Sequence, residues 1–314
     1  MRIKPFPGLE YDMLKCKECL IRINSFGLRG EEIKIPKPEN TIRVLIIGDS
    51  ATFGAGVINN DETIPGRLQR LMDENPPIKG KRIEIINGGI PGYDIQEIYL
   101  HYKYKLKQLN SDIVIYNFFP NDFLNSKFSV ENINGKPMLV RYVNAELPGL
   151  QFLQFLPESI NIFLNEHLLL YRYSMFYISR LFSNENAEAQ SYLKRYQIAN
   201  LEFLNKLIDE IKSANSIFMV SSEIYSFCGN CKEPLDNNRC PIEKGCIYAF
   251  NLIKWLNSEM NNRGIPSVYL SDVVSDMDLR EVMIDEYAHY TGKANIMMAE
   301  KLYKFLLNSK ILEK

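Results

Sequence analysis

The sequence predicts an α/β protein whose central sheet is parallel. Two observations support this fold class. Five short runs of apolar, often β-branched residues are continuous rather than alternating, which is typical of strands buried on both faces. Helical patterns separate these runs, and strands that alternate with helices indicate a parallel sheet covered by helices on both sides.

The predicted elements follow one another along the 314 residues. The expected strands are residues 43–47, 82–88, 112–119, 216–222 and 266–270. The expected helices are residues 64–74, 93–109, about 187–213, 249–264 and 294–308. We expect a single domain over residues 1–314, with a helical insertion at about 127–190 and a cysteine-rich loop at 226–247. The apolar clusters at 146–182 fit two helices packed on the sheet, or a lid over a lipid-like acyl chain.

The charge of the chain is nearly balanced, with 37 Lys and Arg against 38 Asp and Glu and a formal net charge of −1. A nucleic-acid-binding protein needs a basic surface, so we do not expect a nucleic-acid partner. The N-terminus lacks the apolar core of a secretory signal, and no stretch approaches about 18 uninterrupted apolar residues. The sequence therefore predicts a cytoplasmic protein without a transmembrane segment.

Polar residues and glycines directly follow three of the expected strands. They are Gly48-Asp49-Ser50, the segment Asn87–Gly92 and Pro120-Asn121-Asp122, and a fourth polar segment, residues 284–291, precedes the last helix. In open parallel sheets, ligands bind beyond the carboxyl ends of the strands. We therefore expect these four segments to meet at one edge of the sheet.

The four segments can supply the parts of a serine hydrolase. A serine nucleophile such as Ser50 needs a base, and the chain has only three histidines. His101 and His167 lie inside helical patterns, whereas His289 lies in a loop with acidic residues three and four positions before it. Donors for an oxyanion could come from the N–H groups of Ser50 and Gly92 and from the side-chain amide of Asn121.

Taken together, these residues resemble the SGNH hydrolases of the GDSL esterase/lipase superfamily, in which four short blocks contribute Ser, Gly, Asn and His. The blocks here are G-D-S at 48–50, N-G-G-I-P-G at 87–92, N-D at 121–122, and H-Y-T followed by A-N at 289–295. The flanking text INSFGLRG and RVLIIGDSATFGAGV also resembles a bacterial subgroup. The resemblance covers residues 23–125 well and 264–308 fairly well.

The resemblance implies both a fold and a mechanism. The fold would be a flavodoxin-like three-layer α/β/α sandwich around a five-stranded parallel sheet. Ser50 would be the nucleophile and His289 the general base, with Ser50 N–H, Gly92 N–H and Asn121 as the oxyanion hole. Such enzymes hydrolyse esters through an acyl-enzyme and need no cofactor for catalysis.

The chain departs from the family pattern in three places. Phe119-Pro120 precedes Asn121 where the family has a glycine, and Ala294 stands where glycine is frequent. The acid of the triad usually lies three residues before the histidine, a position held here by Glu286, while Asp285 lies one residue earlier. Spacing favours Glu286 and residue type favours Asp285, and we take Asp285 as the slightly better candidate.

Four of the six cysteines crowd into one loop: Cys228, Cys231, Cys240 and Cys246. Their spacing, C-x2-C-x8-C-x5-C, fits a structural zinc site, with disulfides and free thiols as alternatives. The N-terminal C-x-x-C at Cys16 and Cys19 could instead pair with Cys228 and Cys231.

We therefore expect a serine esterase or deacetylase that acts on a small or carbohydrate-linked acyl ester. One alternative is an O-acyltransferase that passes the acyl group to a sugar hydroxyl. The other is a non-catalytic, metal-stabilised binding protein of the same fold. The sequence does not indicate an oligomeric state.

Overall fold

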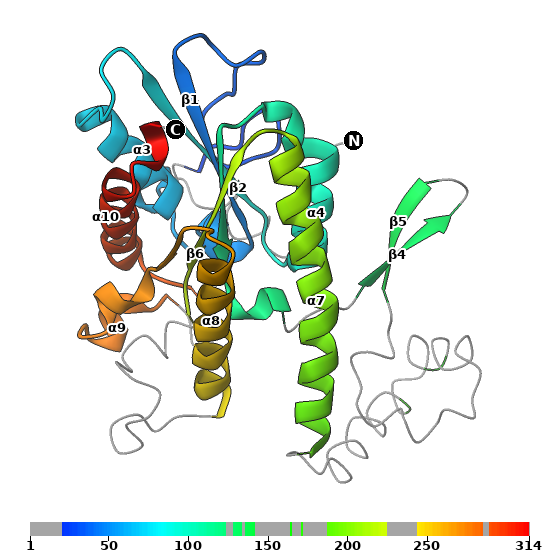
Figure 1. Cartoon of the computed structure of the whole chain (residues 1–314). Coiled ribbons are helices and arrows are strands. Elements are labelled where there is room, and N and C mark those ends of the chain that lie inside the picture. Colours follow the sequence, from blue (N-terminus) through cyan, green and yellow to red (C-terminus); the bar gives the residue numbers. More distant parts are fainter. Residues whose placement is uncertain are drawn as a thin grey trace. The chain divides into compact units, whose positions relative to one another are not determined.

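The computed structural model describes residues 21–123, 128–133, 136–141, 164, 171, 187–224, 244–284 and 289–313. The chain forms two compact units, residues 1–122 with 203–314 and residues 123–202. Figure 1 shows their helices and strands.

The first unit is built on a five-stranded sheet in the order β2-β1-β3-β6-β7, and every pair of neighbours is parallel. The strands are β1 (Thr41–Gly48), β2 (Arg82–Gly89), β3 (Ile113–Phe118), β6 (Ile217–Ser222) and β7 (Ser267–Tyr269). Each agrees with a predicted strand to within two residues at either end. The predicted five-stranded parallel α/β fold is confirmed, and the order of its strands is that of flavodoxin-like folds.

These strands are continuous apolar runs because helices cover both faces of the sheet, so that almost no side chain of a central strand reaches water. Val44, Leu45, Ile46 and Ile47 in β1 are all 0% exposed, so successive side chains are buried on opposite faces. The sheet reverses its order between β1 and β3, and in such folds the switch point is where ligands bind.

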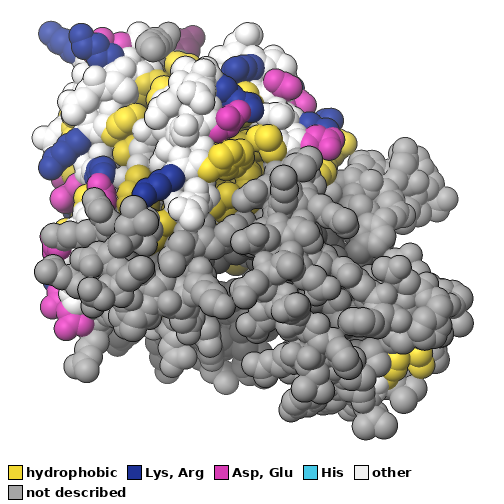
Figure 2. Space-filling model, turned by 60° about the horizontal axis from the view of Figure 1, so that its bottom comes forward, with side chains coloured by type: hydrophobic (Ala, Val, Ile, Leu, Met, Phe, Trp, Pro, Cys, Tyr) yellow, Lys and Arg dark blue, Asp and Glu magenta, His cyan; other side chains and the backbone are white. Residues whose placement is uncertain are grey.

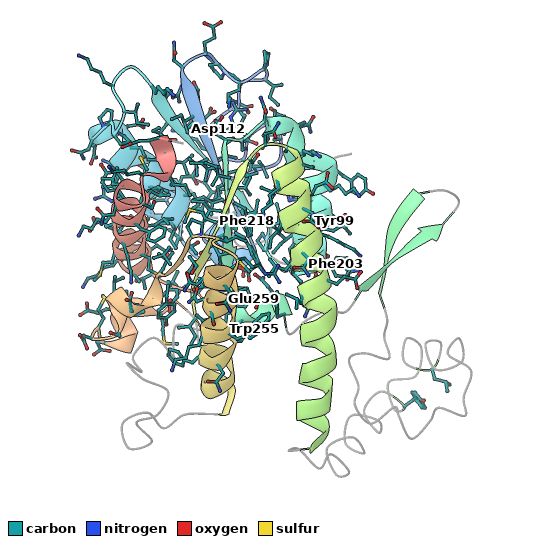
Figure 3. The ribbon with its side chains drawn as sticks, in the orientation of Figure 1. Tyr99, Asp112, Phe203, Phe218, Trp255 and Glu259 are labelled. Carbon is teal, nitrogen blue, oxygen red and sulfur yellow. The ribbon has the colours of Figure 1, made fainter. Side chains whose placement is uncertain are left out.

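One face of the sheet is covered by α3 (Ile64–Glu74) and α10 (Gly292–Asn308), which share a core with alternate residues of β1 such as Val44 and Ile46. The other face is covered by α4 (Ile95–His101), residues 203–213 of α7 (Ala187–Ser213) and α8 (Lys244–Asn262) (Figure 1). Right-handed crossovers place the connecting helices in this way. The connection from β1 to β2 moves along the sheet in the opposite direction to the later connections, so its helix lies on the opposite face. In Figure 3, Tyr99 of α4 lies beside Phe203 of α7, with ring centroids 6.0 Å apart.

Short elements complete this unit. They are α2 (Ser50–Phe53), α9 (Leu279–Val282), the 3₁₀ helices η1 (Asn60–Glu62), η3 (Lys107–Leu109), η4 (Pro120–Phe123), η8 (Ser271–Val274) and η9 (Ile311–Glu313), and the π-helical η2 (Tyr102–Leu106). Among the described helices, none is both long and apolar enough to cross a membrane.

The segment predicted as one helix at 93–109 is divided. It begins at Ile95 because Asp94 caps it, accepting the N–H groups of Gln96 and Glu97, while Glu97 accepts the N–H of Asp94 in return. The chain then continues as the π-helical η2 and the 3₁₀ turn η3, so periodicity located the segment but not its irregular second half.

The second unit contains an antiparallel hairpin of β4 (Phe128–Ile133) and β5 (Lys136–Arg141). This stretch was expected to begin a helical insertion, and for residues 128–141 that expectation is wrong. The sequence pair Asn134-Gly135 is typical of two-residue hairpin loops, and this local signal was missed. The apolar clusters at 146–182 lie outside the described residues, apart from Leu164 and Tyr171.

Both edges of the sheet offer limited room for pairing with a further strand. At the β2 edge, the side-chain amide of Gln69 in α3 accepts the N–H of Ile85 at 2.7 Å and donates to the carbonyl of Ile83 at 3.1 Å. At the other edge, β7 has only three residues. On the described part of the face in Figure 2, basic and acidic side chains are interspersed.

Candidate active site

Ser50 lies at the carboxyl end of β1, in a tight turn that leads directly into α2. Asp49 caps this helix by accepting the N–H of Ala51 at 2.9 Å, and Gly54 ends it with φ 79°, a left-handed conformation that favours glycine. The abrupt Gly-Asp-Ser end of the strand therefore presents the serine hydroxyl on the first residue of a helix.

Two glycines let α2 lie directly on the ends of the strands. A Cβ on Gly48 would lie 2.1 Å from Thr52 Oγ1, and a Cβ on Gly89 would lie 2.4 Å from the backbone nitrogen of Phe53. Real Cβ atoms do not approach other atoms so closely. Because both positions are glycine, α2 packs directly against the ends of the strands, and this close packing determines how far Ser50 lies from the sheet.

Arg29 fixes the other end of α2. Its guanidinium donates to the carbonyls of Phe53, Gly54 and Val57 and to Asn60 Oδ1, at 2.7–3.2 Å, and it stacks over the Phe53 ring. The residue is 2% exposed, and burial lowers its pKa to about 10, which leaves it charged at neutral pH. The INSFGLRG segment thus has a structural purpose, since it places a buried cation at the negative end of the helix that carries Ser50.

His289 reaches Ser50 from the segment between α9 and α10. Met283 and Tyr290 form an isolated antiparallel bridge, and the N–H of Ile284 donates to the carbonyl of His289 at 3.0 Å. The imidazole Nε2 lies 3.0 Å from Ser50 Oγ, within reach for proton transfer. These two residues are 239 positions apart in the sequence, and the fold brings them together.

Ile284, on the segment that carries His289, is packed against the loop that follows α2. A Cβ on Gly56 would lie 3.0 Å from the side chain of Ile284, and Gly56 has φ +82°. The serine segment and the histidine segment therefore contact each other through Gly56 and Ile284 as well as through Ser50 and His289.

Asn121 follows β3 and lies beside the serine turn. Its side-chain amide donates to Asp49 Oδ2 at 3.0 Å, and that oxygen is 3.5 Å from Ser50 Oγ. An amide NH2 has two N–H groups, so the bond to Asp49 leaves one for an oxyanion. Burial raises the pKa of Asp49, and the bonds from Ala51 and Asn121 and the nearby His289 oppose this rise. Asp49 therefore links the helix cap to the orientation of Asn121.

Asp122, the residue after Asn121, fixes the backbone that leads into Asn121. It is 0% exposed, and its Oδ2 accepts from Tyr116 Oη at 2.8 Å and from the N–H of Phe119 at 3.1 Å. Burial, followed by the neighbouring Asp49, raises the pKa of Asp122 well above its usual value. This carboxyl group holds the turn at Phe119-Pro120, which lacks the glycine of the family pattern.

Gly92 lies in the loop after β2. The N–H of Ile90 donates to the carbonyl of Gly48 at 3.0 Å, so this loop starts beside the serine turn. Gly92 itself has φ +81°. That its N–H points toward an oxyanion stays a prediction.

A buried polar network that the sequence did not reveal lies next to Ser50 and His289. Asn117 of β3 donates to Thr52 Oγ1 at 3.1 Å and to Glu223 Oε1, and it accepts from Ser221 Oγ at 2.7 Å. Glu223, directly after β6, is 1% exposed. These contacts join residues from opposite halves of the chain, so no local motif could have indicated them.

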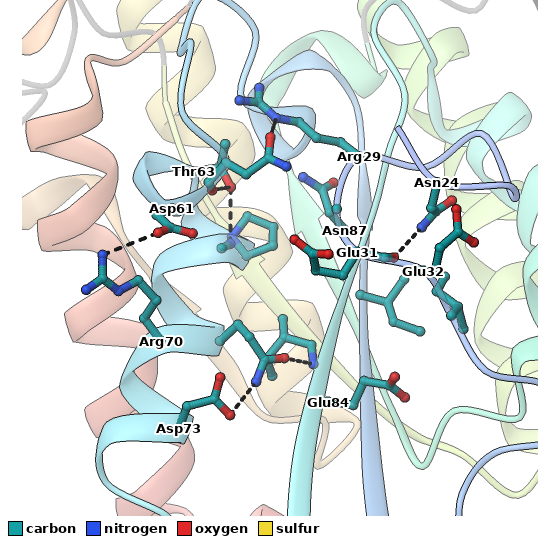
Figure 4. A pocket seen from close by; sticks show the side chains of 18 of the residues that line it. Asn24, Arg29, Glu31, Glu32, Asp61, Thr63, Arg70, Asp73, Glu84 and Asn87 are labelled. Carbon is teal, nitrogen blue, oxygen red and sulfur yellow. Dashed lines mark hydrogen bonds and ion pairs between the residues drawn. The ribbon is translucent and has the colours of Figure 1, made fainter. Parts of the chain in front are cut away.

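A larger cavity lies elsewhere, along the outer edge of β2 (Figure 4). It has a volume of about 290 Å³ and is lined by polar side chains that include Glu31, Asp61, Arg70 and Asp73. Arg70 pairs with Asp61, and Asp73 accepts from Gln69, so these groups are partnered within the cavity wall. None of its lining residues lines the small pocket at His289.

Several predicted site residues lie outside the described part of the chain. They include both candidate acids, Asp285 and Glu286, and the cysteines Cys16, Cys19, Cys228, Cys231 and Cys240, while Cys246 falls in α8 without a described side chain. The acid partner of His289 and the structural zinc site therefore stay predictions. Within the described residues, no group of three or more His, Cys, Asp or Glu side chains is arranged to hold a metal ion.

No protein-family model matches the sequence, and no curated protein matches it. Among solved structures, the chain is similar to the psychrotrophic esterase EstA from Pseudoalteromonas sp., with 15% identity, TM-score 0.47, and 88% of this chain and 100% of that chain covered. It is similar to the acetylxylan esterase Axe2 from Geobacillus stearothermophilus, at 13% identity, TM-score 0.46 and coverage of 84% and 94%. A third is a protein of the G-D-S-L family from Desulfitobacterium hafniense, at 13% identity, TM-score 0.45 and coverage of 84% and 99%.

Proposed function

We propose that this chain is a serine esterase of the SGNH type, which hydrolyses a small or carbohydrate-linked acyl ester through an acyl-enzyme. The observation that carries the proposal is the 3.0 Å contact between Ser50 Oγ and His289 Nε2 at the switch point of the parallel sheet. A hydroxyl and an imidazole at this distance form the nucleophile–base pair that acyl transfer requires.

In the proposed reaction, Ser50 Oγ attacks the ester carbonyl carbon while His289 Nε2 takes the hydroxyl proton. The resulting oxyanion would accept hydrogen bonds from Ser50 N–H, Gly92 N–H and the free N–H of Asn121, each worth about 3 kcal/mol of barrier. His289 then gives the proton to the alcohol oxygen as the C–O bond breaks, which leaves the acyl group on Ser50.

Water completes the cycle. His289 removes a proton from a water molecule, which attacks the acyl carbon, and the same proton returns to Ser50 as the carboxylic acid leaves. The carboxylate that orients the imidazole would come from Asp285 or Glu286, the two acidic residues shortly before it. Burial of Asp49 and its bond to Asn121 support the proposal, because they hold an oxyanion donor next to the nucleophile.

The test is hydrolysis of p-nitrophenyl esters of increasing acyl length, and of acetylated xylan, by wild type and by Ser50→Ala. We expect the rate to fall by at least about 10³-fold in the variant, with a fluorophosphonate probe labelling only the wild type. Equal rates in the two proteins would contradict the proposal. Adding a sugar alcohol and measuring newly formed ester separates hydrolysis from acyl transfer.

A further inference from the structure

The placement of Asn121, the proposed side-chain donor to the oxyanion, depends on two buried carboxyl groups. The Asn121 amide donates to Asp49 Oδ2 at 3.0 Å. Asp122 closes the turn that carries Asn121: its N–H donates to the carbonyl of Phe119 at 2.9 Å, and its Oδ2 accepts the N–H of Phe119 at 3.1 Å. The position of the Asp122 carboxyl group therefore determines the course of the backbone from which the Asn121 side chain extends.

Tyr116 ties this carboxyl group to the core of the sheet. Its Oη donates to Asp122 Oδ2 at 2.8 Å. Tyr116 lies in β3, is 0% exposed, and meets the Phe118 ring edge to face with the centroids 6.0 Å apart. Burial, followed by the charge of Asp122, raises the pKa of Tyr116 well above its usual value, so the hydroxyl keeps the proton that it donates. A fixed side chain of the core therefore determines where the Asp122 carboxyl group can lie.

The surroundings of Asp122 disfavour a negative charge. Its side chain is 0% exposed, and among the described residues no lysine or arginine bonds to it. The ionisable groups that act on it are Asp49 before α2, Asp94 before α4 and Tyr116 of β3, and none of them is a cation. Burial, followed by the charge of Asp49, raises the pKa of Asp122 well above its usual value, although the bonds from Phe119 and Tyr116 oppose this rise.

The hydrogen bonds of Asp122 fit a carboxyl group that carries a proton. Both printed donors, Tyr116 Oη and the N–H of Phe119, bond to Oδ2, while Oδ1 is buried and has no partner among the described residues. In the ionised state, Oδ1 would be a charged oxygen without a donor, which is costly to bury. A proton on Oδ1 removes that charge and leaves Oδ2 to accept both bonds.

Asp49 is bonded differently, although it is also buried at 1% exposure. Both of its oxygens have donors: Oδ1 accepts the N–H of Ala51 at 2.9 Å, and Oδ2 accepts from Asn121 at 3.0 Å. Two carboxylates that share a buried region repel each other, so one negative charge is favoured over two. That one charge is better placed on Asp49, because there each oxygen has a donor.

We propose that Asp122 is a positioning residue for the oxyanion donor Asn121, and that it holds the turn as a neutral carboxylic acid. This inference rests on the proposed function. Asp122 takes no part in bond making; it fixes the turn that presents the Asn121 amide, and it adds no second negative charge beside Asp49. A second anion there would oppose the charge that develops on the oxyanion in the transition state.

The first experiment compares Asp122→Asn with Asp122→Ala in the hydrolysis of p-nitrophenyl acetate. Asparagine resembles the neutral acid, because its amide oxygen can accept from Tyr116 and Phe119 and its NH2 can take the place of the protonated oxygen. We expect Asp122→Asn to keep kcat within about threefold of wild type. Asp122→Ala should lower kcat at least about tenfold with KM changed by less than about twofold, because an oxyanion donor acts mainly in the transition state.

Asp112→Asn is the matched control, with the same substitution just before β3 instead of just after it. Asp112 accepts from Lys37 Nζ at 2.6 Å and from the N–H of Arg43 at 2.7 Å, as expected for an ionised carboxylate. We expect Asp112→Asn to lower the urea midpoint of unfolding at neutral pH and to leave kcat unchanged. Asp122→Asn should raise that midpoint, because the wild type must hold a proton on folding that the unfolded chain has lost, and the gain should vanish below about pH 4.

The second experiment observes the proton itself and does not depend on catalysis. The infrared spectrum of the wild type is recorded at about pH 8, where Glu97 and Glu223, each with a pKa of about 7, are largely ionised. We expect the C=O stretch of a protonated carboxylic acid in the wild type and its loss in Asp122→Asn. In Tyr116→Phe the band should move to higher frequency, because the carboxyl group loses one hydrogen bond.

Four results would overturn the proposal. They are the absence of the band from the wild type, an equal loss of kcat in Asp122→Asn and Asp122→Ala, wild-type kcat in Asp122→Ala, and a lower unfolding midpoint in Asp122→Asn. Failure of the proposed function would be visible separately, as hydrolysis that does not depend on Ser50, and it would leave the band and the midpoints unchanged.

Discussion

Arg29 donates a 2.7 Å hydrogen bond to the carbonyl of Gly54, the residue that ends the helix carrying Ser50. A buried arginine usually pairs with a carboxylate, but this one bonds to backbone carbonyls and one amide. Arg29 therefore ties the segment of residues 23–30 to the segment that carries Ser50.

Replacing Arg29 should weaken both the fold and the reaction. Arg29→Met retains the apolar stem but removes one donor from each of the carbonyls of Phe53, Gly54 and Val57, at about 1–3 kcal/mol for a buried group left without any donor. Gly54 keeps a hydrogen bond from the N–H of Val57 at 3.2 Å, and Phe53 keeps one from Asn87 Nδ2 at 3.4 Å. We expect the free energy of unfolding in urea to fall by about 3 kcal/mol and kcat to fall with it. Arg22→Met, which removes an exposed arginine paired with Glu31, should change stability by less than about 1 kcal/mol. Equal unfolding midpoints for the two variants would argue against this role of Arg29.

Gly89→Ala should displace the serine helix. The new Cβ would lie 2.4 Å from the backbone nitrogen of Phe53, so α2 must move. Because a misplacement of about 1 Å can cost about 100-fold, we expect kcat to fall at least tenfold, with a stability loss of about 1–3 kcal/mol. Gly80→Asn is the control, since a Cβ there meets nothing within 4 Å and asparagine tolerates its φ of +78°. Wild-type kcat in Gly89→Ala would show that the close approach is not needed.

Asp49 should act on catalysis through Asn121. We expect Asn121→Ala to lower kcat by about 10²–10³-fold, as for the loss of an oxyanion donor. Asp49→Ala removes both the helix cap and the anchor of Asn121, so kcat and stability should both fall. In a double-mutant cycle, Asp49→Ala should add little to the kcat defect of Asn121→Ala. Fully additive defects would mean that the two residues act independently.

Glu223 should make stability depend on pH with a definite sign. Its folded pKa of about 7 is above the ordinary glutamate value of 4.5, so the folded state binds the proton more tightly than the unfolded state. The contribution is fully present below about pH 4.5 and is lost as the pH rises through about 7, at about 3 kcal/mol for a shift of this size. Relative to wild type, Glu223→Gln should therefore gain about this amount between about pH 5 and about pH 8.

Wild type and Glu223→Gln must be compared with each other because His101 changes the pH dependence of stability in the opposite direction. Burial lowers the pKa of His101 to about 4, so its contribution to stability grows as the pH rises from about 4 to 6.5. This term is the same in wild type and in Glu223→Gln and cancels in their difference. Urea unfolding of both proteins across this pH range measures the effect, and parallel curves would refute it.

The sequence predicted the strands closely because buried parallel strands leave a local pattern that short windows reveal. It also indicated Ser50 and His289, because four polar segments were expected to meet at one edge of the sheet and together resemble the blocks of a known family. Arg29 and Glu223 were missed, since their meaning depends on contacts 25 and 106 positions away. The hairpin at 128–141 was missed for a different reason: the apolar content of the whole segment outweighed a short turn signal at Asn134-Gly135.

Gln69 has a consequence for association between chains. The edge of a sheet normally offers unpaired backbone groups to any other strand, and this is a common route to fibres. Here the N–H of Ile85 and the carbonyl of Ile83 are already bonded to the amide of Gln69, which occupies the place of a sixth strand. A second molecule that pairs with β2 at Ile83 and Ile85 must first displace the Gln69 side chain, which is held by its own helix.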